Sequence, residues 1–569
     1  MTARAVRIIT EVAAVDRPFD YLLNALTDHV GVGDRVRVDF NHRSVRGWVI
    51  DGATPSGELK IVKKWLGYGP PSSMLELLRW ASERWYGTWS RFLLAASPRR
   101  VITTLPRAPE PAPLALALKA AAWDGPAGVI QLAPTTDPLA LILGAYEATR
   151  GAEGSLLVLV PTESWAGRLR GRLEQRGCAV ASGDDQWDRM RAGWPVVVGA
   201  RGAALAPVPR VAGAVIIDAD DESYRSSATP TWEAVAMLRE RCSRDKAPLW
   251  CTSMIPSPAL LNGGGYEKDR DLVGGWPRVE IVDRRQSDPH EGVLAPVALD
   301  AARRALESDD PVAVAVILQR LGTGRLLACV ACGELARCAT CHQAEEEVGE
   351  QLACGERHEF RARFCRACGS TNLRRLRVGV TTLARDLAAQ LNQKVSEVTA
   401  ALDPSTPLER VVVGTEATWQ RVRRCGVVIF VDFDQYLLAP RESARRAAVN
   451  AIGKAGRLVG SRRDGRGLVV LQTRRGDDDV VHALVDGDFD AIIHEDVATA
   501  RLLSLSPFGA SAEVTGEGAE AFVAELPSSL VSVHKTPTGY VVRAKEMATL
   551  TGALRDVDRP AQKFRVAVQ

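Results

Sequence analysis

Residues 326–370 read LLACVACGELARCATCHQAEEEVGEQLACGERHEFRARFCRACGS and contain seven of the eleven cysteines of the chain. Six of the seven form Cys-x-x-Cys pairs and one stands alone, in the order Cys329/Cys332, Cys338/Cys341, Cys354 and Cys365/Cys368. A Cys-x-x-Cys turn presents two thiolates to the same ion, and two such turns can complete a tetrahedral Zn²⁺ shell with Zn–S distances of about 2.3 Å. The stretch therefore predicts a zinc-binding insertion.

Two other uses of clustered cysteines fit less well. Disulfides are not expected, because no signal-like segment begins the chain and the remaining cysteines are scattered in apolar runs. A redox role is also not expected, because three neighbouring pairs serve metal geometry better than dithiol exchange. Thiolate-rich shells are usually structural, so we expect a metal that stabilises a folded ribbon rather than a catalytic zinc.

Seven thiolates suggest two zinc ions with one substituted ligand. The outer pairs, Cys329/Cys332 and Cys365/Cys368, are expected to close one site around the inner one. The inner site would take Cys338, Cys341 and Cys354. Its fourth ligand is preferably His358, four residues after Cys354, because this spacing occurs in zinc fingers. The alternatives are His342, a water molecule, a glutamate, or an inner site without metal.

Length and composition indicate a globular, multidomain protein. A chain of 569 residues predicts three or four domains, and 46% hydrophobic with 25% charged residues excludes intrinsic disorder. The sequence contains no run of 18 uncharged apolar residues and no secretory leader, so we expect a cytoplasmic protein without a membrane partner. The net charge of +3 does not by itself indicate a nucleic-acid partner.

The first 50 residues alternate apolar and polar side chains, which predicts a small antiparallel barrel or sheet. Between its first two strands lie Phe19, Asp20 and Tyr21. One interpretation is that these aromatic residues belong to the core at a strand end. The functional interpretation is a pocket in which a base stacks on an aromatic ring while the carboxylate accepts a hydrogen bond from a sugar hydroxyl.

Helical spacing over 72–95 and a proline-rich segment at 105–113 follow. Short apolar strands then alternate with helical segments, first from 128 to 253 and again from 312 to 473, which predicts two α/β lobes with parallel sheets. The cysteine-rich insertion follows the first strand of the second lobe. The expected parts are a β-rich domain at 1–104, a linker at 105–125, lobe 1 at 126–262, a connector with the start of lobe 2 at 263–325, the insertion at 326–373, lobe 2 at 374–505 and a C-terminal α+β domain at 506–569.

This arrangement resembles the bacterial primosomal protein N′ (PriA) family of superfamily 2 DNA helicases, which restart stalled replication. RPFDYLL (17–23) and GDRVRVDF (33–40) resemble the family's 3′-DNA-end-binding domain. CVACGELARCATC (329–341) and CRACGS (365–370) resemble its zinc ribbon, while VVVGTEATWQ (411–420), VVIFVDFD (427–434) and GKAGR (453–457) resemble segments of its second lobe. The resemblance implies two tandem RecA-like lobes and covers nearly the whole chain.

By this resemblance Phe19, Asp20 and Tyr21 line the pocket for the terminal nucleotide, and Lys60 matches a family lysine. Two departures affect these sites. Asn41 stands where the family has a glycine, and Gln351 stands where the family has the first cysteine of a third inner pair. The first departure alters the backbone of the pocket, and the second is why the inner zinc site needs a substitute ligand.

The nucleotide site departs further. A superfamily 2 motor needs a GxxGxGKT loop, whose N–H groups and lysine hold the phosphates. The strand at 128–133 is instead followed by Pro134-Thr135-Thr136-Asp137-Pro138. The prolines lack N–H donors and Asp137 places a negative charge where phosphate would lie. The chain has 11 lysines and 61 arginines, and no lysine lies between Lys119 and Lys246 to supply the missing cation.

Two further nucleotide motifs are also changed. The family's DEEH segment corresponds to Asp218-Ala219-Asp220-Asp221, which keeps a metal-binding aspartate but lacks the acid that polarises water. In the second lobe Lys454 replaces the first family arginine while Arg457 remains. Lysine lacks the planar fork that grips a phosphate. We therefore expect no ATP hydrolysis, no catalytic residues, and a degenerate nucleotide site around Thr135, Thr136, Asp218 and Arg457.

The sequence thus predicts a nucleoid-associated protein that recognises forked or single-stranded DNA with a 3′ end and assembles primosome proteins without helicase activity. The alternatives are an active 3′→5′ helicase with divergent motifs and an adaptor that binds replisome proteins but little DNA. The family's winged-helix domain is expected to be absent before lobe 1. A candidate phosphate-contacting face is formed by Arg441, Arg445, Arg446, Arg457, Arg462 and Arg463.

Overall fold

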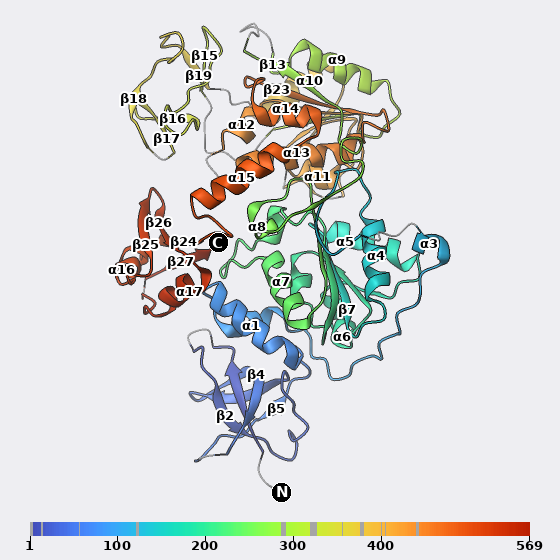
Figure 1. Cartoon of the computed structure of the whole chain (residues 1–569), viewed down its shortest axis with the longest axis vertical. Coiled ribbons are helices and arrows are strands. Elements are labelled where there is room, and N and C mark those ends of the chain that lie inside the picture. Colours follow the sequence, from blue (N-terminus) through green and yellow to red (C-terminus); the bar gives the residue numbers. More distant parts are fainter. Residues whose placement is uncertain are drawn as a thin grey trace. The chain divides into compact units, whose positions relative to one another are not determined.

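The computed structural model describes residues 4–569 apart from 13–14, 56, 121–124, 286–291, 319–326, 356, 376–379, 400, 404, 440–442 and 561. The chain folds as two compact units, coloured along the sequence in Figure 1. The first unit contains residues 1–130, 137–267 and 497–569, and the second contains residues 131–136 and 268–496. Each unit is built around its own parallel sheet.

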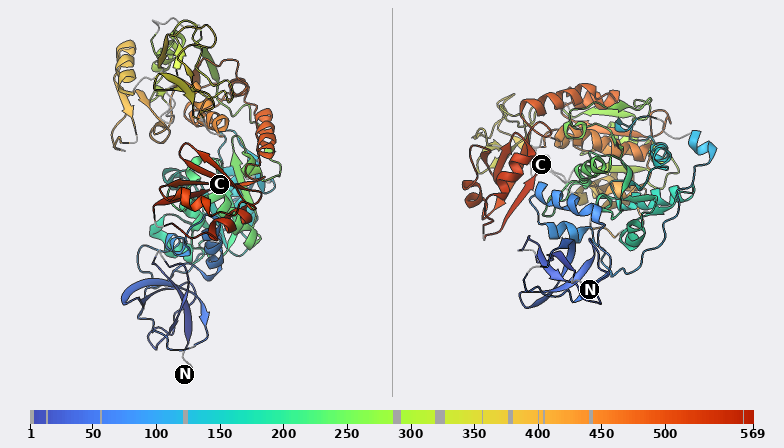
Figure 2. Two further views of the ribbon diagram at one scale, coloured as in Figure 1. Left: turned by 90° about the vertical axis from the view of Figure 1, so that its left-hand side faces the viewer. Right: turned by 60° about the horizontal axis from the view of Figure 1, so that its bottom comes forward.

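The N-terminal part of the first unit is a small antiparallel β structure, seen at the N-terminal end in Figure 2. Its strand order is β2-β1-β4-β3-β5, with bounds β1 Ala5–Thr10, β2 Phe19–Leu22, β3 Arg35–Phe40, β4 Arg43–Ala53 and β5 Lys64–Trp65. Leu22 hydrogen-bonds to the segment around Ile61, and β5 pairs with β3, so the sheet closes on itself as a barrel. Alternate side chains such as Val6, Ile8 and Val36 fill its interior, as the period-two pattern predicts.

Two packed helices follow the barrel, α1 (Ser72–Arg84) and α2 (Trp89–Ala95). The apolar residues of α1 recur at helical spacing, and Met74, Leu75, Leu77 and Leu78 are buried. The helix ends because Tyr86 has a left-handed backbone with φ 49° and Gly87 follows it. The helical stretch at 72–95 is thus two helices with a sharp turn between them.

The parallel sheet of the first unit has the strand order β12-β6-β11-β10-β7-β9-β8. The bounds are β6 Gly128–Gln131, β7 Ser155–Leu159, β8 Val180–Ala181, β9 Val196–Gly199, β10 Val211–Ile216, β11 Leu249–Ser253 and β12 Glu267–Lys268. Every residue of β7, β9 and β10 is buried, because α4 (Leu139–Thr149), α5 (Glu163–Glu174) and α7 (Ala234–Asp245) belong to the same layered unit. Burial on both faces explains why these strands are continuous apolar runs.

The second unit has a six-stranded parallel sheet in the order β13-β23-β22-β14-β21-β20. Its strands are β13 Val279–Asp283, β14 Val314–Ile317, β20 Val395–Val398, β21 Val411–Gly414, β22 Val427–Phe430 and β23 Leu468–Thr473. The strands β13 and β20 form its two edges, and β13 lies before the range 312–473 in which the strands of this lobe were expected. The helices α9 (Pro296–Leu306), α10 (Val380–Leu391) and α13 (Ala444–Val459) complete the lobe.

The last segment of the first unit is an α+β domain. Its antiparallel sheet has the order β25-β26-β24-β27, formed by β24 Ala510–Gly516, β25 Ser532–Thr536, β26 Gly539–Ala544 and β27 Phe564–Val568. The helices α16 (Ala519–Ala524) and α17 (Met547–Arg555) belong to it. The predicted α/β class, with two parallel lobes, an N-terminal β-rich part and a C-terminal α+β part, is confirmed. None of the helices in the described part of the chain combines the length and apolarity needed to cross a membrane.

Candidate nucleic-acid interface and metal centres

Strand β2 carries the residues expected to contact a DNA end. Successive side chains of a strand point to opposite faces: Tyr21 is buried in the barrel interior, Asp20 faces away, and Phe19, at the start of the strand, packs against the core only in part. Tyr21 is 3% exposed and its hydroxyl donates to the backbone oxygen of Asp39 at 3.1 Å. Burial, and secondarily the charge of Asp39, raises the pKa of Tyr21, so the hydroxyl stays protonated as a donor. Tyr21 therefore supports the site from inside, while the half-buried Phe19 and Asp20 reach the surface.

The Asp20 carboxylate is paired on the outside of the barrel. Arg7 Nε on β1 donates to Asp20 Oδ1 at 3.2 Å, and both side chains remain partly exposed. Lys60 is exposed, and its backbone oxygen accepts a hydrogen bond from the N–H of Leu22 on β2. The structure thus places Lys60 beside β2. Arg7 was not expected from the sequence, because nothing in the local pattern reveals which residue lies across the sheet from Asp20.

The β3–β4 turn lies next to Phe19. Phe40 at the end of β3 packs against Phe19, with ring centroids 5.0 Å apart. Asn41 and His42 connect β3 to β4 and have left-handed backbones with φ 47° and 60°. A two-residue hairpin of this kind needs positive φ at both positions, and asparagine accepts it better than most residues. Asn41 therefore provides a backbone conformation that a glycine at this position would adopt readily.

The four outer cysteines come together in the second unit. Strand β15 (Leu327–Cys329) pairs with β19 (Leu373–Arg375), which brings the first Cys-x-x-Cys turn beside the last. The Sγ atoms of Cys329 and Cys368 are 3.5 Å apart, as are those of Cys332 and Cys365. Gly333 and Gly369 follow the two turns with φ 75° and 74°, and each N–H donates to the first cysteine of its pair. These glycines close the two turns around one point.

The inner cluster joins Cys338, Cys341 and Cys354 to His358. The His358 Nδ1 atom lies 3.5 Å from Cys354 Sγ and 3.9 Å from Cys338 Sγ. His342, the alternative ligand, instead has φ 56° and donates its N–H to the Cys338 oxygen. It therefore occupies the position that Gly333 and Gly369 occupy in the outer turns. Gln351 lies on β17 (Gln351–Cys354), opposite Val348, and is not part of the cluster.

Both clusters have the dimensions of a metal site. Within each set of four, all candidate ligand atoms lie within 4.8 Å of one another. A tetrahedral shell with Zn–S bonds of about 2.3 Å has sulfur atoms about 3.8 Å apart, close to the observed spacing. The ribbon is further held by a buried ion pair between Arg361 and Glu345, with an Nε–Oε2 distance of 2.9 Å. Each cluster can therefore hold one metal ion.

The helix that follows β6 begins with a carboxylate of the chain itself. Asp137 Oδ1 accepts the N–H of Leu139 at 3.1 Å, at the first residue of α4, and Arg172 of α5 pairs with the same carboxylate. Burial, the largest single influence, acts to raise the pKa of Asp137, but the hydrogen bonds from Arg172 and the Leu139 N–H, together with the charges of Arg172 and Arg176, outweigh it and lower the pKa. A helix N-terminus attracts anions, and here an internal anion fills that position. No phosphate is needed to satisfy this end of α4.

The preceding residues, 131–136, belong to the second unit and are bonded within it. Thr135 Oγ1 donates to the Gly275 oxygen and Thr136 Oγ1 donates to Asp269 Oδ2, each at 2.7 Å. Arg457 Nε of α13 donates to the Pro134 oxygen at 3.0 Å. The two hydroxyl groups and the guanidinium nitrogen expected at a degenerate nucleotide site are thus bonded to the protein itself.

Asp218 lies in the first unit, beyond the end of β10. It is 7% exposed, has φ 53°, and its N–H donates to Thr252 Oγ1 at 3.0 Å. Asp220 Oδ2 accepts hydrogen bonds from Ser253 Oγ at 2.8 Å and from the Ser257 N–H at 3.1 Å. These bonds join the end of β10 to the residues that follow β11. The aspartates therefore serve the structure of this loop.

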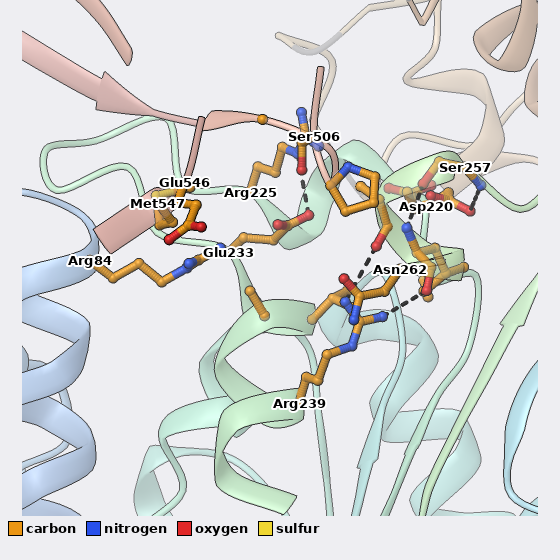
Figure 3. A pocket seen from close by; sticks show the side chains of 18 of the residues that line it. Arg84, Asp220, Arg225, Glu233, Arg239, Ser257, Asn262, Ser506, Glu546 and Met547 are labelled. Carbon is orange, nitrogen blue, oxygen red and sulfur yellow. Dashed lines mark hydrogen bonds and ion pairs between the residues drawn. The ribbon is translucent and has the colours of Figure 1, made fainter. Parts of the chain in front are cut away.

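A polar cavity of about 340 Å³ lies beside Asp220 within the first unit (Figure 3). Arg225 pairs with Glu233 at 3.4 Å, and Arg239 donates to the Ala259 and Leu260 oxygens. The wall of the cavity carries four cationic and four anionic side chains: Arg84, Arg225, Arg239 and Lys545, with Asp220, Asp221, Glu233 and Glu546. The balance of charge gives this cavity no clear preference for a phosphate group.

The basic region at 441–463 does not form a free face. Arg445 pairs with Glu495 at 2.8 Å, and the largely buried Arg446 pairs with Asp496 at 2.6 Å. Arg462 donates to the backbone oxygens of Pro277, Val485 and Asp486, and Arg463 pairs with Asp271. Arg441 lies outside the described residues. The described arginines of this region are therefore used within the protein, which a run of charges in a sequence does not reveal.

Residues 7–98 match the family model of the 3′ DNA-binding domain (3′BD) of PriA. The chain is 28% identical over 428 residues to the probable replication restart protein PriA of Mycobacterium tuberculosis, covering 66% of this chain and 65% of that protein. It is 23% identical over 372 residues to PriA of Haemophilus influenzae and 27% identical over 348 residues to PriA of Treponema pallidum. These two matches cover 60% and 55% of this chain and 50% of each relative. The matches therefore span about half to two thirds of the relatives' lengths.

The solved structures that match the chain share little sequence with it. The DUF1998 helicase MrfA bound to DNA has a TM-score of 0.39 at 12% identity, over 82% of this chain and 69% of that one. Saccharomyces cerevisiae Dbp5 bound to RNA and ADP BeF3 has a TM-score of 0.35 at 11% identity, over 68% of this chain and 88% of that one.

Proposed function

Since the chain belongs to the PriA family of replication restart proteins, we propose that it recognises stalled or branched replication forks through a 3′ DNA end and nucleates primosome assembly without unwinding DNA. The observation that carries the proposal is the match of residues 7–98 to a 3′ DNA-binding domain whose β2 brings Phe19 and Asp20 to the surface of the barrel. Recognition of the end, rather than motion along DNA, is the proposed activity.

In the proposed recognition, two side chains contact different parts of the terminal nucleotide. The Phe19 ring offers an apolar face for the terminal base, since bases stack on aromatic side chains whatever their sequence. The Asp20 carboxylate accepts a hydrogen bond from the terminal 3′ hydroxyl, exchanging its surface pair with Arg7 for this bond. An exposed ion pair of this kind contributes only about 0.2–1 kcal/mol. The charge-assisted hydrogen bond between Asp20 and the 3′ hydroxyl can therefore offset the loss of the pair with Arg7.

A fork-binding titration tests the proposal. The wild-type protein is expected to bind a fork with a free 3′ hydroxyl more tightly than the same fork blocked by a 3′ phosphate. Asp20→Ala is expected to reduce this preference about 10-fold or more, as for loss of one hydrogen bond to a charged group. The Glu76→Ala variant removes an exposed carboxylate of α1 outside the barrel and is the matched control. Equal binding of the two forks by the wild-type protein would refute the proposal.

The absence of a motor is proposed from the contacts of the β6–α4 segment. Asp137 lies at the N-terminus of α4, and the hydroxyls of Thr135 and Thr136 are bonded within the protein. We expect turnover of radiolabelled ATP to stay at the background rate when forked DNA is added. Turnover stimulated by forked DNA would instead favour an active 3′→5′ helicase.

The two ligand clusters are proposed to hold zinc, because thiolate-rich tetrahedral sets favour this ion and it adds folding energy to small ribbons. Metal analysis of the purified protein is expected to give about two zinc ions per chain, one for each cluster. The Cys365→Ser variant is expected to lose the outer ion, and His358→Ala the inner one. An unchanged metal content in Cys365→Ser would contradict the outer assignment.

A further inference from the structure

An arginine covers the aromatic ring that the proposed function offers to DNA. The Cζ atom of Arg17 lies over the Phe19 ring, 5.1 Å from its centroid, and the Arg17 side chain is exposed. Phe19 is half-buried and also contacts Phe40 and the barrel core. Within the described residues, Arg17 has no hydrogen bond or ion pair. Among the described residues, the Phe19 ring is therefore what holds the Arg17 side chain.

The strengths of the competing contacts decide what a DNA end does here. A cation–π contact at an exposed site is weaker than the stacking of a nucleobase on an aromatic ring. The Phe19 ring is also held in place by its contacts with Phe40 and the core, whereas the Arg17 side chain is held only by this weak contact with the ring. A base can therefore displace the guanidinium without rearranging the barrel.

We propose that Arg17 is a displaceable cover of Phe19: the terminal base of a 3′-ended strand takes the ring face, and the released guanidinium binds the neighbouring phosphodiester. The exchange rests on the proposed recognition of a 3′ end and assigns its phosphate contact to a residue outside the Phe19-Asp20-Tyr21 set. It uses one side chain for two purposes, since Arg17 shields an apolar ring in the free protein and neutralises a phosphate in the complex. Arginine suits both purposes, because its planar group stacks on rings and binds phosphate oxygens.

The experiment uses the full chain and a fork whose 3′-terminal base is 2-aminopurine, a base whose fluorescence falls when it stacks. Binding is measured across a salt series. The wild-type protein is expected to quench the fluorescence. Arg17→Ala is expected to keep the quenching but to lower the slope of log K against log salt by about 0.7, the value for one phosphate contact to a single strand. Arg17→Lys is expected to keep most of the slope.

Two further variants separate the ring from the charge. Phe19→Leu keeps apolar volume in the barrel and is expected to lose the quenching. Arg99→Ala removes an arginine that is 89% exposed and paired with Asp184 outside the barrel, and is expected to change neither readout. The proposal is overturned if Arg17→Ala has the wild-type slope, or if it loses quenching as Phe19→Leu does.

The outcomes also distinguish this proposal from the proposed function. If the wild-type protein binds 3′-hydroxyl and 3′-phosphate forks equally, the function itself fails, and the Arg17 exchange fails with it. If the wild-type protein prefers the 3′ hydroxyl but Arg17→Ala keeps the wild-type slope, the function stands and the exchange alone is wrong.

Discussion

The β3–β4 turn and the β6–α4 loop both depart from what the family pattern asks of them, but with opposite structural results. In the turn, Asn41 takes φ 47°, so the hairpin keeps a conformation open to glycine. In the loop, Pro134 and Pro138 lack N–H donors and Asp137 satisfies the start of α4 from within. Asn41 thus preserves the backbone conformation of the turn and with it the proposed DNA-end site. Asp137 instead occupies the N-terminus of α4, where a phosphate would otherwise bind.

The largest effect should come from breaking the turn. Asn41→Val places a β-branched side chain at a positive φ, which costs about 1–2 kcal/mol and is expected to speed amide exchange in β3 and β4. It is also expected to weaken 3′-end binding, because Phe40 and thus Phe19 would move. Hydrogen exchange detected by mass spectrometry measures the first effect and the fork titration the second.

Asn41→Gly is the matched control, since glycine adopts the same φ without strain. It should leave both readouts near wild type. If Asn41→Val also behaves like wild type, the turn conformation is not what keeps the site.

The next effect should come from the loop. Asp137→Ala removes the carboxylate that accepts the Leu139 N–H, and is expected to lower the local opening free energy of α4 by about 1 kcal/mol. Fork binding should not change, and calorimetry should detect no ATP binding, because the prolines remain. Arg172→Ala, which removes the ion pair but leaves the cap, should have a smaller effect. ATP binding by Asp137→Ala would show that the carboxylate alone excludes the nucleotide.

A similar or smaller effect is expected at Thr135. Thr135→Val keeps the shape of the side chain but removes the donor to the Gly275 oxygen, and should cost about 0.5–1 kcal/mol in local opening of residues 131–136. Thr135→Ser keeps the hydroxyl and should retain most of the protection from hydrogen exchange. Equal protection in the two variants would mean that the hydroxyl does not hold the segment.

The smallest effect is a dependence on pH. The pKa of Asp137 is lowered in the folded protein, so its charge stabilises the fold above the unfolded pKa of about 3.9, and this contribution is lost as pH falls through the lower folded value. The difference in α4 protection between wild type and Asp137→Asn should be about 0.2–1 kcal/mol near pH 7, because the ion pair is half exposed. It should shrink below pH 4. A difference that grows on acidification would give the shift the wrong sign.

The sequence allowed the parts with strong local patterns to be predicted. Continuous apolar runs such as the one that contains Val196–Gly199 marked the buried strands, and Cys-x-x-Cys spacing indicated which cysteines meet, since these signals are local. The edge strand Val279–Asp283 was missed because it is only partly buried and has no continuous apolar run.

Contacts between distant residues could not be predicted. Nothing near Asp137 indicates that Arg172 pairs with it, and nothing near Phe19 indicates that Phe40 packs on it. For the same reason the sequence did not reveal that the arginines of the region 441–463 are paired within the protein. Glu495 and Asp496, which pair with Arg445 and Arg446, lie some 50 residues away in the chain. The role of His342 was equally hidden, since a left-handed residue after a cysteine turn is usually glycine.

The position of the cysteine-rich ribbon has a consequence for biosynthesis. The ribbon follows β14, which lies in the middle of its sheet between β22 and β21. Both neighbours are translated after the ribbon, so a nascent β14 waits with two unpaired edges until later segments emerge. Unpaired apolar strands are prone to aggregate. A ribbon that folds promptly around its ions shortens the distance between β14 and its later partners, so metal scarcity during translation should reduce the yield of native lobe.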